Sequence, residues 1–348
     1  MMKILITGGA GFIGSALVRF IIEQQQDEVL VVDKLSYAAH PYALASVNAD
    51  PRYHFKKLDI TARDALQEVI DAFKPDAVMH LAAETHVDRS IVGADAFMQS
   101  NYLGTYTLLE AVRQYWQALP TAKREQFRLL HVSTDEVYGD LPHPDSEPKA
   151  SALKFTESST LCPSSPYSAS KAASDHLVQA WHRSYGLPTI ISRCSNNYGP
   201  FQFAEKLIPH MVQAALKLQP LTIYGSGQQI RDWLYVDDHV KALYLLLSKA
   251  EVGQVYNIGA DNEHRNLDLV QAICRILDQR VPRADGASYA DLIVHVTDRP
   301  GHDRRYAVDS SKLRAATGWA PTQDFEEGLA STVAWFVRDF DAADKYRA

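Results

Sequence analysis

Short apolar runs alternate with longer amphipathic stretches along the first 200 residues of the chain. The runs have the length of buried strands, and the stretches between them repeat apolar positions at helical spacing. We expect strands at 4–6, 29–32, 53–58, 77–81, 129–132 and 189–192, and helices at about 13–24, 62–73, 94–116 and 168–185. Strands that alternate with helices in this way form a parallel sheet covered on both faces. The pattern therefore predicts an α/β fold with a doubly wound parallel sheet.

The pattern becomes less regular after about residue 199. We expect strands at 221–224, 233–236 and 255–258, and helices at about 204–218, 237–249, 266–279 and 324–339. We assign residues 1–198 to the sheet domain and 199–340 mainly to a smaller C-terminal α/β substrate domain, with elements around 236–260 returning to the sheet. The segment 140–166, rich in Pro and Ser, is predicted to be a long functional loop. The tail 341–348 is predicted to be frayed.

Composition and charge exclude several classes of protein. With 46% hydrophobic and 22% charged residues, the chain is not expected to be disordered. The formal net charge of -7 argues against a nucleic-acid-binding protein. No apolar run approaches the ~20 residues of a membrane span, and no signal peptide is visible. Three cysteines, Cys162, Cys194 and Cys274, lack metal-ligand spacing, so we expect reduced thiols, no metal site and a cytoplasmic protein.

A glycine-rich turn follows the first expected strand and precedes the first expected helix. Gly8, Gly11 and Gly14 have the spacing G-x-x-G-x-x-G, which allows a tight turn and a close approach to a pyrophosphate at the start of the helix. Asp33 ends the second strand, where its carboxylate can accept hydrogen bonds from ribose hydroxyls and repel a 2′-phosphate. Asp59 ends the third strand and could bond the adenine amine. These features favour a Rossmann-type NAD site over a turn that binds no nucleotide.

Tyr167 and Lys171 stand four residues apart at the start of the helix expected at 168–185. Side chains at this spacing lie on one face of a helix. An ammonium group close to a phenol lowers the phenol's pKa from about 10, and we expect this effect at Tyr167. A tyrosine tuned in this way can remove a proton from a sugar hydroxyl. The pair by itself is also compatible with a surface or packing role.

The glycine turn and the Tyr-x-x-x-Lys pair together resemble the extended short-chain dehydrogenase/reductase family, over nearly the whole chain. Within that family, the segment 133–139, with the sequence STDEVYG, strongly resembles the dTDP-glucose 4,6-dehydratases. Sugar-nucleotide epimerases of the family usually lack this acidic pair. The resemblance implies a lyase that converts dTDP-glucose to dTDP-4-dehydro-6-deoxy-glucose. It would oxidise C4, eliminate water across C5–C6 and reduce C6, regenerating NAD in each cycle.

The resemblance also implies roles for individual residues. Thr134 would bond the C4 oxygen, Asp135 would be the acid at the C6 hydroxyl, and Glu136 would be the base at C5. Because two neighbouring carboxyl groups in a closed site cannot both ionise cheaply, we expect one of them to be protonated. Tyr167 and Lys171 complete the implied catalytic set.

Further positions of this chain match the family's binding residues. The implied cofactor-binding residues are Gly8, Gly11, Phe12, Ile13, Gly14, Asp33, Lys34, Ser36, Asp59, Ile60, Leu81, Ala82, Ala83, Ser100, Tyr167, Lys171 and Asn197. The implied substrate-binding residues are Thr85, Thr134, Asn196, Lys206, Leu207, Thr222, Tyr224, Arg231, Asn266, Arg299 and His302. Guanidinium groups suit a nucleoside diphosphate because they bind its oxygens in pairs. We expect His86, Asp88 and Arg89 to form a local charge network instead.

Several alternatives stay open at this point. The chain could be a 4,6-dehydratase of a CDP-, UDP- or GDP-hexose, an epimerase or decarboxylase of the same fold, or a non-catalytic NAD-binding regulator. The helices at about 94–116 and 168–185 could pair across a two-fold axis, as in the four-helix dimer of the family, or could simply cover the sheet. A dehydratase product of this kind would feed rhamnose and other deoxysugars.

Overall fold

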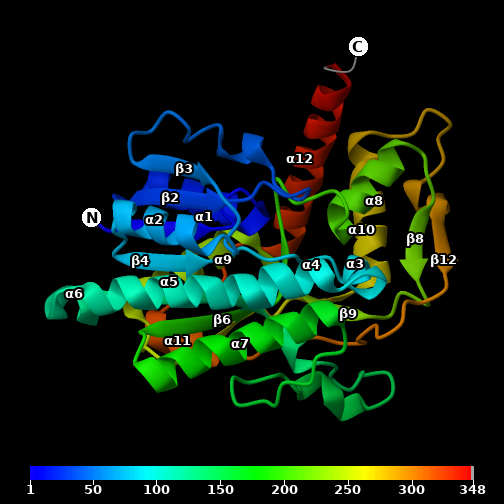
Figure 1. Ribbon diagram of the computed structural model, residues 1–348. Helices are drawn as coiled ribbons and strands as arrows, with labels where there is room; N and C mark the ends of the chain where they lie inside the picture. The colour runs from blue at the N-terminus through cyan, green and yellow to red at the C-terminus, as the bar shows by residue number, and fades with distance from the viewer. Residues whose placement is uncertain (346–348) are drawn as a thin grey trace.

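The computed structural model describes residues 1–345 of the chain, and a wholly parallel seven-stranded sheet forms its centre (Figure 1). The strand order is β10-β6-β5-β4-β1-β2-β3. The strands are β1 Lys3–Thr7, β2 Glu28–Asp33, β3 Tyr53–Lys57, β4 Ala77–His80, β5 Arg128–Thr134, β6 Thr189–Cys194 and β10 Val255–Ile258. The predicted α/β class is confirmed. The order reverses between β1 and β4, and open sheets bind ligands at such a switch point.

The central strands are apolar throughout because both faces of the sheet are covered. Ile4 and Ile6 belong to the hydrophobic cluster on one face, and Leu5 between them belongs to the cluster on the other face. All three side chains are completely buried. Successive side chains of a strand point to opposite faces of the sheet. A strand that is buried on both faces therefore has a continuous apolar sequence.

Helices cover both faces. α1 Phe12–Gln24, α9 Val236–Lys249 and α11 Ser311–Thr317 pack on the first face, and α2 Arg63–Phe73, α5 Gly104–Ala118 and α7 Pro166–Tyr185 on the second. α5 and α7 run side by side across the second face (Figure 1).

α7 has strong signals at both of its ends. Ser165 and Ser168 form a capping box, Pro166 occupies the first turn, and Gly186 ends the helix at φ +73°. These signals fix the register of α7 and therefore the position of Tyr167 and Lys171.

The helix predicted at 94–116 is interrupted in the structure. α3 Val87–Val92 and α4 Asp95–Phe97 precede a π-helical segment, η2 Met98–Leu103, and only then does α5 begin. The buried Asn101 explains this segment: its amide donates to the Glu84 carbonyl and the Ser170 hydroxyl, and its oxygen accepts from the Glu84 backbone N–H. A π-turn adds a residue within a helix and redirects side chains, which is common at functional sites.

The C-terminal part forms a second lobe with its own hydrophobic cluster. It contains α8 Leu207–Leu216, α10 Asn266–Arg280, α12 Phe325–Lys345, the parallel pair β8 Leu221–Tyr224 and β12 Ile293–Val296, and the three-stranded sheet β11 Glu263–Arg265, β9 Ile230–Tyr235 and β7 Asn196–Tyr198. Figure 1 shows this lobe beside the carboxyl ends of the central strands. The lobe thereby borders the region where the order of the central strands reverses.

Two further local predictions need correction. The strand predicted at 233–236 begins at Ile230 and ends at Tyr235, because residue 236 already starts α9. The tail is helical to Lys345, whereas fraying was predicted from residue 341; residues 346–348 lie outside the described residues. The sequence pattern also missed β7, β11, β12, α3, α11 and α6 Thr121–Gln126, which are too short to show a period. Within residues 1–345, no helix is long and apolar enough to cross a membrane.

Candidate active site

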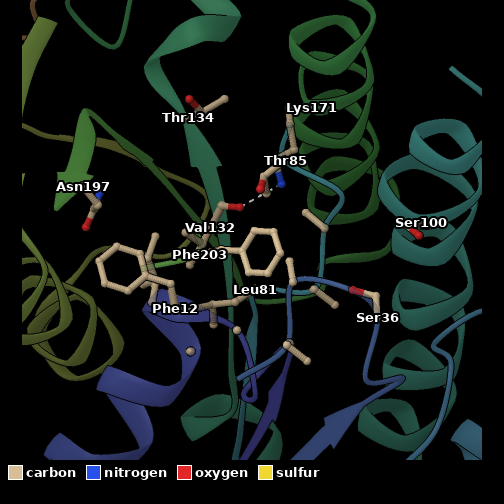
Figure 2. Close-up of a pocket in the computed structure, with 18 of the residues that line it drawn as sticks. Phe12, Ser36, Leu81, Thr85, Ser100, Val132, Thr134, Lys171, Asn197 and Phe203 are labelled. Carbon is tan, nitrogen blue, oxygen red and sulfur yellow. Dashed lines mark hydrogen bonds between the residues drawn. The ribbon is translucent and has the colours of Figure 1, made fainter. Parts of the chain in front are cut away.

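A deep pocket opens at the carboxyl ends of the central strands, at the switch point and against the second lobe (Figure 2). All the residues predicted to bind the cofactor line it, together with Thr85, Thr134, Asp135, Glu136, Asn196 and Lys206. Asn197 lies across the pocket from Ser36 and Ser100 (Figure 2). The fold thus gathers residues from the whole length between Gly8 and Lys206 into one cavity.

The glycine turn is shaped by close backbone contacts. Gly8 has φ +74°, and a Cβ at this residue would lie 2.6 Å from the Ala82 nitrogen. A Cβ at Gly14 would lie 2.1 Å from the Gly8 carbonyl oxygen. α1 starts here without a side-chain cap, so the N–H groups of its first turn remain available to a ligand. This arrangement fits a pyrophosphate bound at the start of the helix.

Asp33 is held at the end of β2 by two backbone contacts. Its Oδ2 accepts from the Ala10 N–H at 2.9 Å, and its Oδ1 accepts from the Leu35 N–H at 2.7 Å. The carboxylate is therefore fixed in orientation while it lines the pocket. Asp59 is oriented in a similar way by Thr61, whose N–H and hydroxyl both donate to its Oδ1 at 2.9 Å. Both acidic side chains are preorganised as acceptors for a ligand.

Lys171 extends from α7 to the sheet. Its Nζ donates to the Val132 carbonyl at 2.9 Å, the contact drawn in Figure 2. Burial lowers the pKa of Lys171 to about 8, although the nearby Asp175 acts in the opposite direction. This value leaves the ammonium form populated at neutral pH.

Tyr167 does not show the lowered pKa that the sequence predicted. Burial and the nearby Glu136 carboxylate hold the pKa of the Tyr167 phenol well above its usual value, and only a hydrogen bond with Thr134 counteracts them. The prediction was wrong because i,i+4 spacing fixes a face of the helix but not where an ammonium group ends. Lys171 is directed at the Val132 carbonyl. A positively charged ligand beside Tyr167 would favour the phenolate.

Asp135 and Glu136 begin the 3₁₀ turn η3 Asp135–Tyr138, which follows β5 directly. The Thr134 hydroxyl accepts from the Glu136 N–H at 3.3 Å and caps the turn. Asp135 is buried, and its Oδ2 has no hydrogen-bond partner within residues 1–345. Burial together with Glu136 raises the pKa of Asp135 well above the usual value. The direction agrees with the expectation that one carboxyl of the pair is protonated.

Glu136 borders the pocket in a cationic field. Its enclosure raises its pKa, and Lys206, Arg231 and Arg299 oppose that shift. Because the neighbouring cations favour the ionised form, Glu136 is better suited than Asp135 to act as a base. The two adjacent carboxyl groups thus have environments that suit opposite proton-transfer roles.

The predicted substrate residues fall into two groups. Thr85, Thr134, Asn196 and Lys206 line the pocket, and Lys206 donates to the Thr85 carbonyl at 2.8 Å. The others lie in the second lobe, outside this lining: Leu207, Thr222, Tyr224, Arg231, Asn266, Arg299 and His302. Leu207 packs against the lobe's core, and Thr222 is exposed on β8.

Polar groups in and beside the pocket keep unused hydrogen-bonding capacity. Buried atoms without a hydrogen-bond partner in the described part of the chain include Asn196 Oδ1, Asn266 Oδ1 and Arg299 Nε. Buried polar atoms are normally paired, so these atoms are available for hydrogen bonds with a polar ligand. Arg231 is also buried, where it donates to the Asp303 carbonyl and lies over the Tyr306 ring.

The segment 86–89 bridges the two lobes and is not a local network. Arg89 Nε bonds Glu205 at 3.0 Å, and Asp88 pairs with Arg299 at 2.7 Å. The Arg89 guanidinium also lies 3.8 Å above the Tyr37 ring. The prediction of a charge network was correct in kind, but the partners of these side chains come from distant parts of the chain.

Several pocket residues were not predicted from the sequence. They are Val32, Ala38, Ala39, Leu58, Val132, Ser133, Cys194, Ser195, Gln202, Phe203 and Glu205. Most of them lie in the last residues of a central strand or in the loop that follows it, and this position was the available signal. Phe203 and its neighbours lie in an irregular loop, where no periodic pattern indicates position.

Comparison with known proteins places these features in a family. The family model described as GDP-mannose 4,6 dehydratase matches residues 5–332. A curated dTDP-glucose 4,6-dehydratase from Salmonella typhimurium is 55% identical over 337 residues, which cover 97% of this chain and 93% of the relative. Another from Haemophilus influenzae is 56% identical over 339 residues, which cover 97% of this chain and 98% of the relative.

Solved structures show the same relationship. The structure of DesIV, a dTDP-glucose 4,6-dehydratase from Streptomyces venezuelae with NAD and TYD bound, superposes with a TM-score of 0.87 at 40% identity and covers 98% of each chain. A UDP-glucose 4-epimerase from Thermotoga maritima shares the fold at a TM-score of 0.82 and 27% identity, covering 97% of this chain and 100% of that one. The chain therefore belongs to the family described as GDP-mannose 4,6 dehydratase, and its similarity to dTDP-glucose 4,6-dehydratases extends over almost its full length.

Proposed function

We propose that the chain is an NAD-dependent hydro-lyase that converts dTDP-glucose to dTDP-4-dehydro-6-deoxy-glucose. The observation that carries this proposal is the placement of the Asp135–Glu136 pair and the Tyr167–Lys171 pair in one pocket with the glycine turn. Curated relatives described as dTDP-glucose 4,6-dehydratases are 53–56% identical to the chain. The nucleotide and the sugar follow from this similarity, and the chemistry follows from the pocket.

NAD fits the pocket. When bound, it would supply the oxidation at C4 and the later reduction at C6, so that no external reductant is needed. The N–H groups at the start of α1 would bind its pyrophosphate. Asp33 would accept hydrogen bonds from the adenosine ribose, and Asp59 would lie at the adenine. Lys171 would reach the second ribose from α7.

Tyr167 would remove the proton from the C4 hydroxyl, with Thr134 hydrogen-bonded to the same oxygen. Both side chains are buried, so water does not compete for these contacts. The phenol needs a lower pKa than it has in the described structure, and the positive nicotinamide ring supplies an electrostatic reason for that change. The bound cofactor would thus favour the phenolate form of Tyr167, which accepts the proton of the C4 hydroxyl.

The acidic pair would perform the elimination. A ketone at C4 makes the C5 proton acidic, and Glu136 in its cationic field would remove it. Asp135, whose raised pKa keeps its proton, would give that proton to the departing C6 hydroxyl, which leaves as water. When C6 is reduced, Glu136 would return the proton to C5. The second lobe would hold the nucleoside diphosphate through Lys206, Arg231 and Arg299, with the base near Tyr224, Asn266 and His302.

One assay tests the proposed function. The purified protein is incubated with dTDP-glucose without added cofactor, and the nucleotide sugar is followed by mass spectrometry. We expect loss of one water with no net accumulation of NADH. Unchanged mass with inversion at C4 would identify an epimerase. No conversion of dTDP-glucose, even with added NAD, would contradict the proposal; parallel assays with UDP-, CDP- and GDP-hexoses would show whether another sugar nucleotide is the substrate.

Asp33→Ser is expected to weaken NAD binding by about 10- to 100-fold, because hydrogen bonds to a charged group contribute ~1.5–3 kcal/mol. The ratio of NADP to NAD affinity is expected to rise, since the charge that repels a 2′-phosphate is removed. Calorimetric titration of cofactor-free protein with each dinucleotide measures both effects. Asp71→Asn, an exposed change on α2, is the control. Unchanged discrimination in Asp33→Ser would contradict the assignment of this carboxylate.

We further propose a cytoplasmic homodimer, with residues 1–198 as the NAD-binding domain and 199–340 mainly as the sugar-nucleotide domain. Large apolar side chains are exposed along α3, η2 and α5, where Val92 is 92% exposed; the others are Ile91, Met98, Tyr102, Leu103 and Tyr106. Tyr106 meets Trp181 of α7, which in turn contacts the exposed Tyr185. Exposed apolar side chains in such number on neighbouring elements favour an interface between two copies over a surface in contact with water.

The double variant Met98→Glu/Tyr102→Glu is expected to be monomeric, because two charges would be placed in the proposed interface. Sedimentation or light scattering coupled to gel filtration measures the mass. Tyr42→Glu, a change at a side chain that is 81% exposed elsewhere, should leave the dimer intact. A wild-type monomer, or a double variant that remains dimeric, would refute this interface.

A further inference from the structure

A chain of buried polar side chains joins α7 to the turn that carries the acidic pair. Asp175 Oδ2 accepts from Arg193 Nε at 2.8 Å, and Arg193 Nη1 donates to the Tyr138 hydroxyl at 2.9 Å. That hydroxyl donates to Asn257 Oδ1 at 2.8 Å. Each of the four residues is at most 2% exposed, and none lines the pocket. They therefore act on the site only through other residues.

At one end of this row of hydrogen-bonded side chains, Asp175 adjoins Lys171. Asp175 follows Lys171 by one turn of α7, and the carboxylate raises the pKa of the ammonium against the effect of burial. The second carboxylate oxygen lies 3.4 Å from His131 Nε2. His131 directly precedes Val132, whose carbonyl accepts from Lys171. Asp175 is thus linked to Lys171 in two ways. It lies one helical turn from the lysine on α7, and through His131 it adjoins β5, the strand whose Val132 carbonyl accepts from the lysine.

At the other end of the row, Tyr138 and Asn257 fix the position of the η3 turn. Tyr138 is the last residue of η3, two positions after Glu136. Its ring stacks on Phe155 at 4.9 Å, and the Asn257 amide donates to the Phe155 carbonyl at 3.0 Å. Asn257 lies on β10, so the tyrosine is fixed both to the central sheet and to the loop after η3. A short 3₁₀ turn has few hydrogen bonds of its own, and these contacts fix its direction.

Stability alone does not explain this arrangement. Removing Asp175 and Arg193 from water is costly, and apolar residues of similar volume often stabilise a core as well as or better than a buried ion pair. What the polar chain supplies is a unique geometry, because each hydrogen bond constrains distance and angle. The two catalytic pairs lie on separate elements, α7 and η3, whose relative position must be set.

We propose that Asp175, Arg193, Tyr138 and Asn257 form a positioning network that keeps the Asp135–Glu136 pair in register with the Tyr167–Lys171 pair. One bound sugar can then be oxidised at C4 and deprotonated at C5 without changing its pose. The inference rests on the proposed dehydratase function and assigns these four residues a role in it. Misplacement of a catalytic group by about 1 Å can cost on the order of 100-fold in rate, so such a network has a measurable effect.

Tyr138→Phe tests the network with the loss of one oxygen atom. We expect the elimination step to slow at least about tenfold while C4 oxidation changes less than about twofold. In a single turnover with dTDP-glucose, absorbance at 340 nm should then rise transiently, and the deuterium isotope effect for substrate labelled at C5 should increase. Backbone hydrogen exchange of the segment 135–139, measured by mass spectrometry without substrate, should become faster.

A matched control and a second variant complete the experiment. Tyr289→Phe removes another buried tyrosine hydroxyl, which donates to the Val281 carbonyl in the second lobe, and should behave as wild type. Arg193→Lys keeps the charge beside Asp175 but loses the guanidinium donor to Tyr138. Like Tyr138→Phe, it should slow elimination much more than C4 oxidation. It also provides the test if Tyr138→Phe does not fold.

The outcomes separate the inference from the function on which it rests. If wild type makes no 4-keto-6-deoxy product, the proposed function fails, and faster exchange of 135–139 in Tyr138→Phe then supports only the structural part of the network. If wild type is active and both variants keep its partition between oxidation and elimination, the positioning role is refuted. Equal slowing of both steps with unchanged exchange would overturn it as well.

Discussion

Replacing Glu136 by glutamine is expected to stop the reaction after oxidation at C4. Glutamine has nearly the shape of glutamate but cannot remove the C5 proton, and a positioned general base contributes about 10²- to 10⁴-fold. The rate of water loss should fall by that factor, while C4 oxidation continues because Tyr167, Thr134 and Lys171 are unchanged. The variant should therefore accumulate NADH on mixing with dTDP-glucose.

The measurement combines rapid-mixing absorbance at 340 nm with mass spectrometry of the quenched nucleotide sugar. We expect a stable rise in absorbance, a mass lower by two hydrogens and no loss of water. Glu125→Gln, an exposed change on α6, should turn over as wild type does. Water loss at the wild-type rate in Glu136→Gln would show that another group is the base at C5.

Tyr167→Phe has the second large expected effect, and it acts on the earlier step. Without the phenolic oxygen, the C4 hydroxyl has no base, so oxidation should slow by about 10²- to 10⁴-fold. Neither NADH nor the dehydrated product should then form. The fold should persist, because the ring keeps its edge contact with Phe97 at 6.3 Å and only a hydroxyl is lost.

Thermal unfolding and NAD titration of Tyr167→Phe separate a chemical defect from a structural one, and both should remain close to wild type. Tyr115→Phe is a matched control, because the Tyr115 hydroxyl donates to the carbonyl of Pro75, which precedes β4 and does not line the pocket. The double variant Tyr167→Phe/Glu136→Gln should resemble Tyr167→Phe, since elimination follows oxidation. NADH accumulation in the double variant would contradict the order of the two steps.

The sheet and the cofactor turn could be predicted from the sequence, because both depend on local patterns. Continuous apolar runs such as Ile4–Ile6 can be satisfied only by burial on two faces, and the structure confirms those strands. The spacing of Gly8, Gly11 and Gly14 is a requirement of the backbone, and Gly14 in fact leaves no room for a Cβ. Asp33 was predicted because it ends a strand, and parallel strands end at one edge of the sheet. Glu136 was implied by the resemblance of the segment 133–139 to the dTDP-glucose 4,6-dehydratases.

Contacts that join distant parts of the chain became visible only in the folded structure. Asp88 pairs with Arg299, which is 211 residues away, and neither periodicity nor spacing carries such information. The π-segment 98–103 depends on Asn101 meeting Ser170, so an apparently continuous helix pattern concealed it. The prediction that the pKa of Tyr167 is lowered was wrong for a related reason. Helical spacing placed Lys171 on the same face, but burial and Glu136 decided the electrostatic field around the phenol.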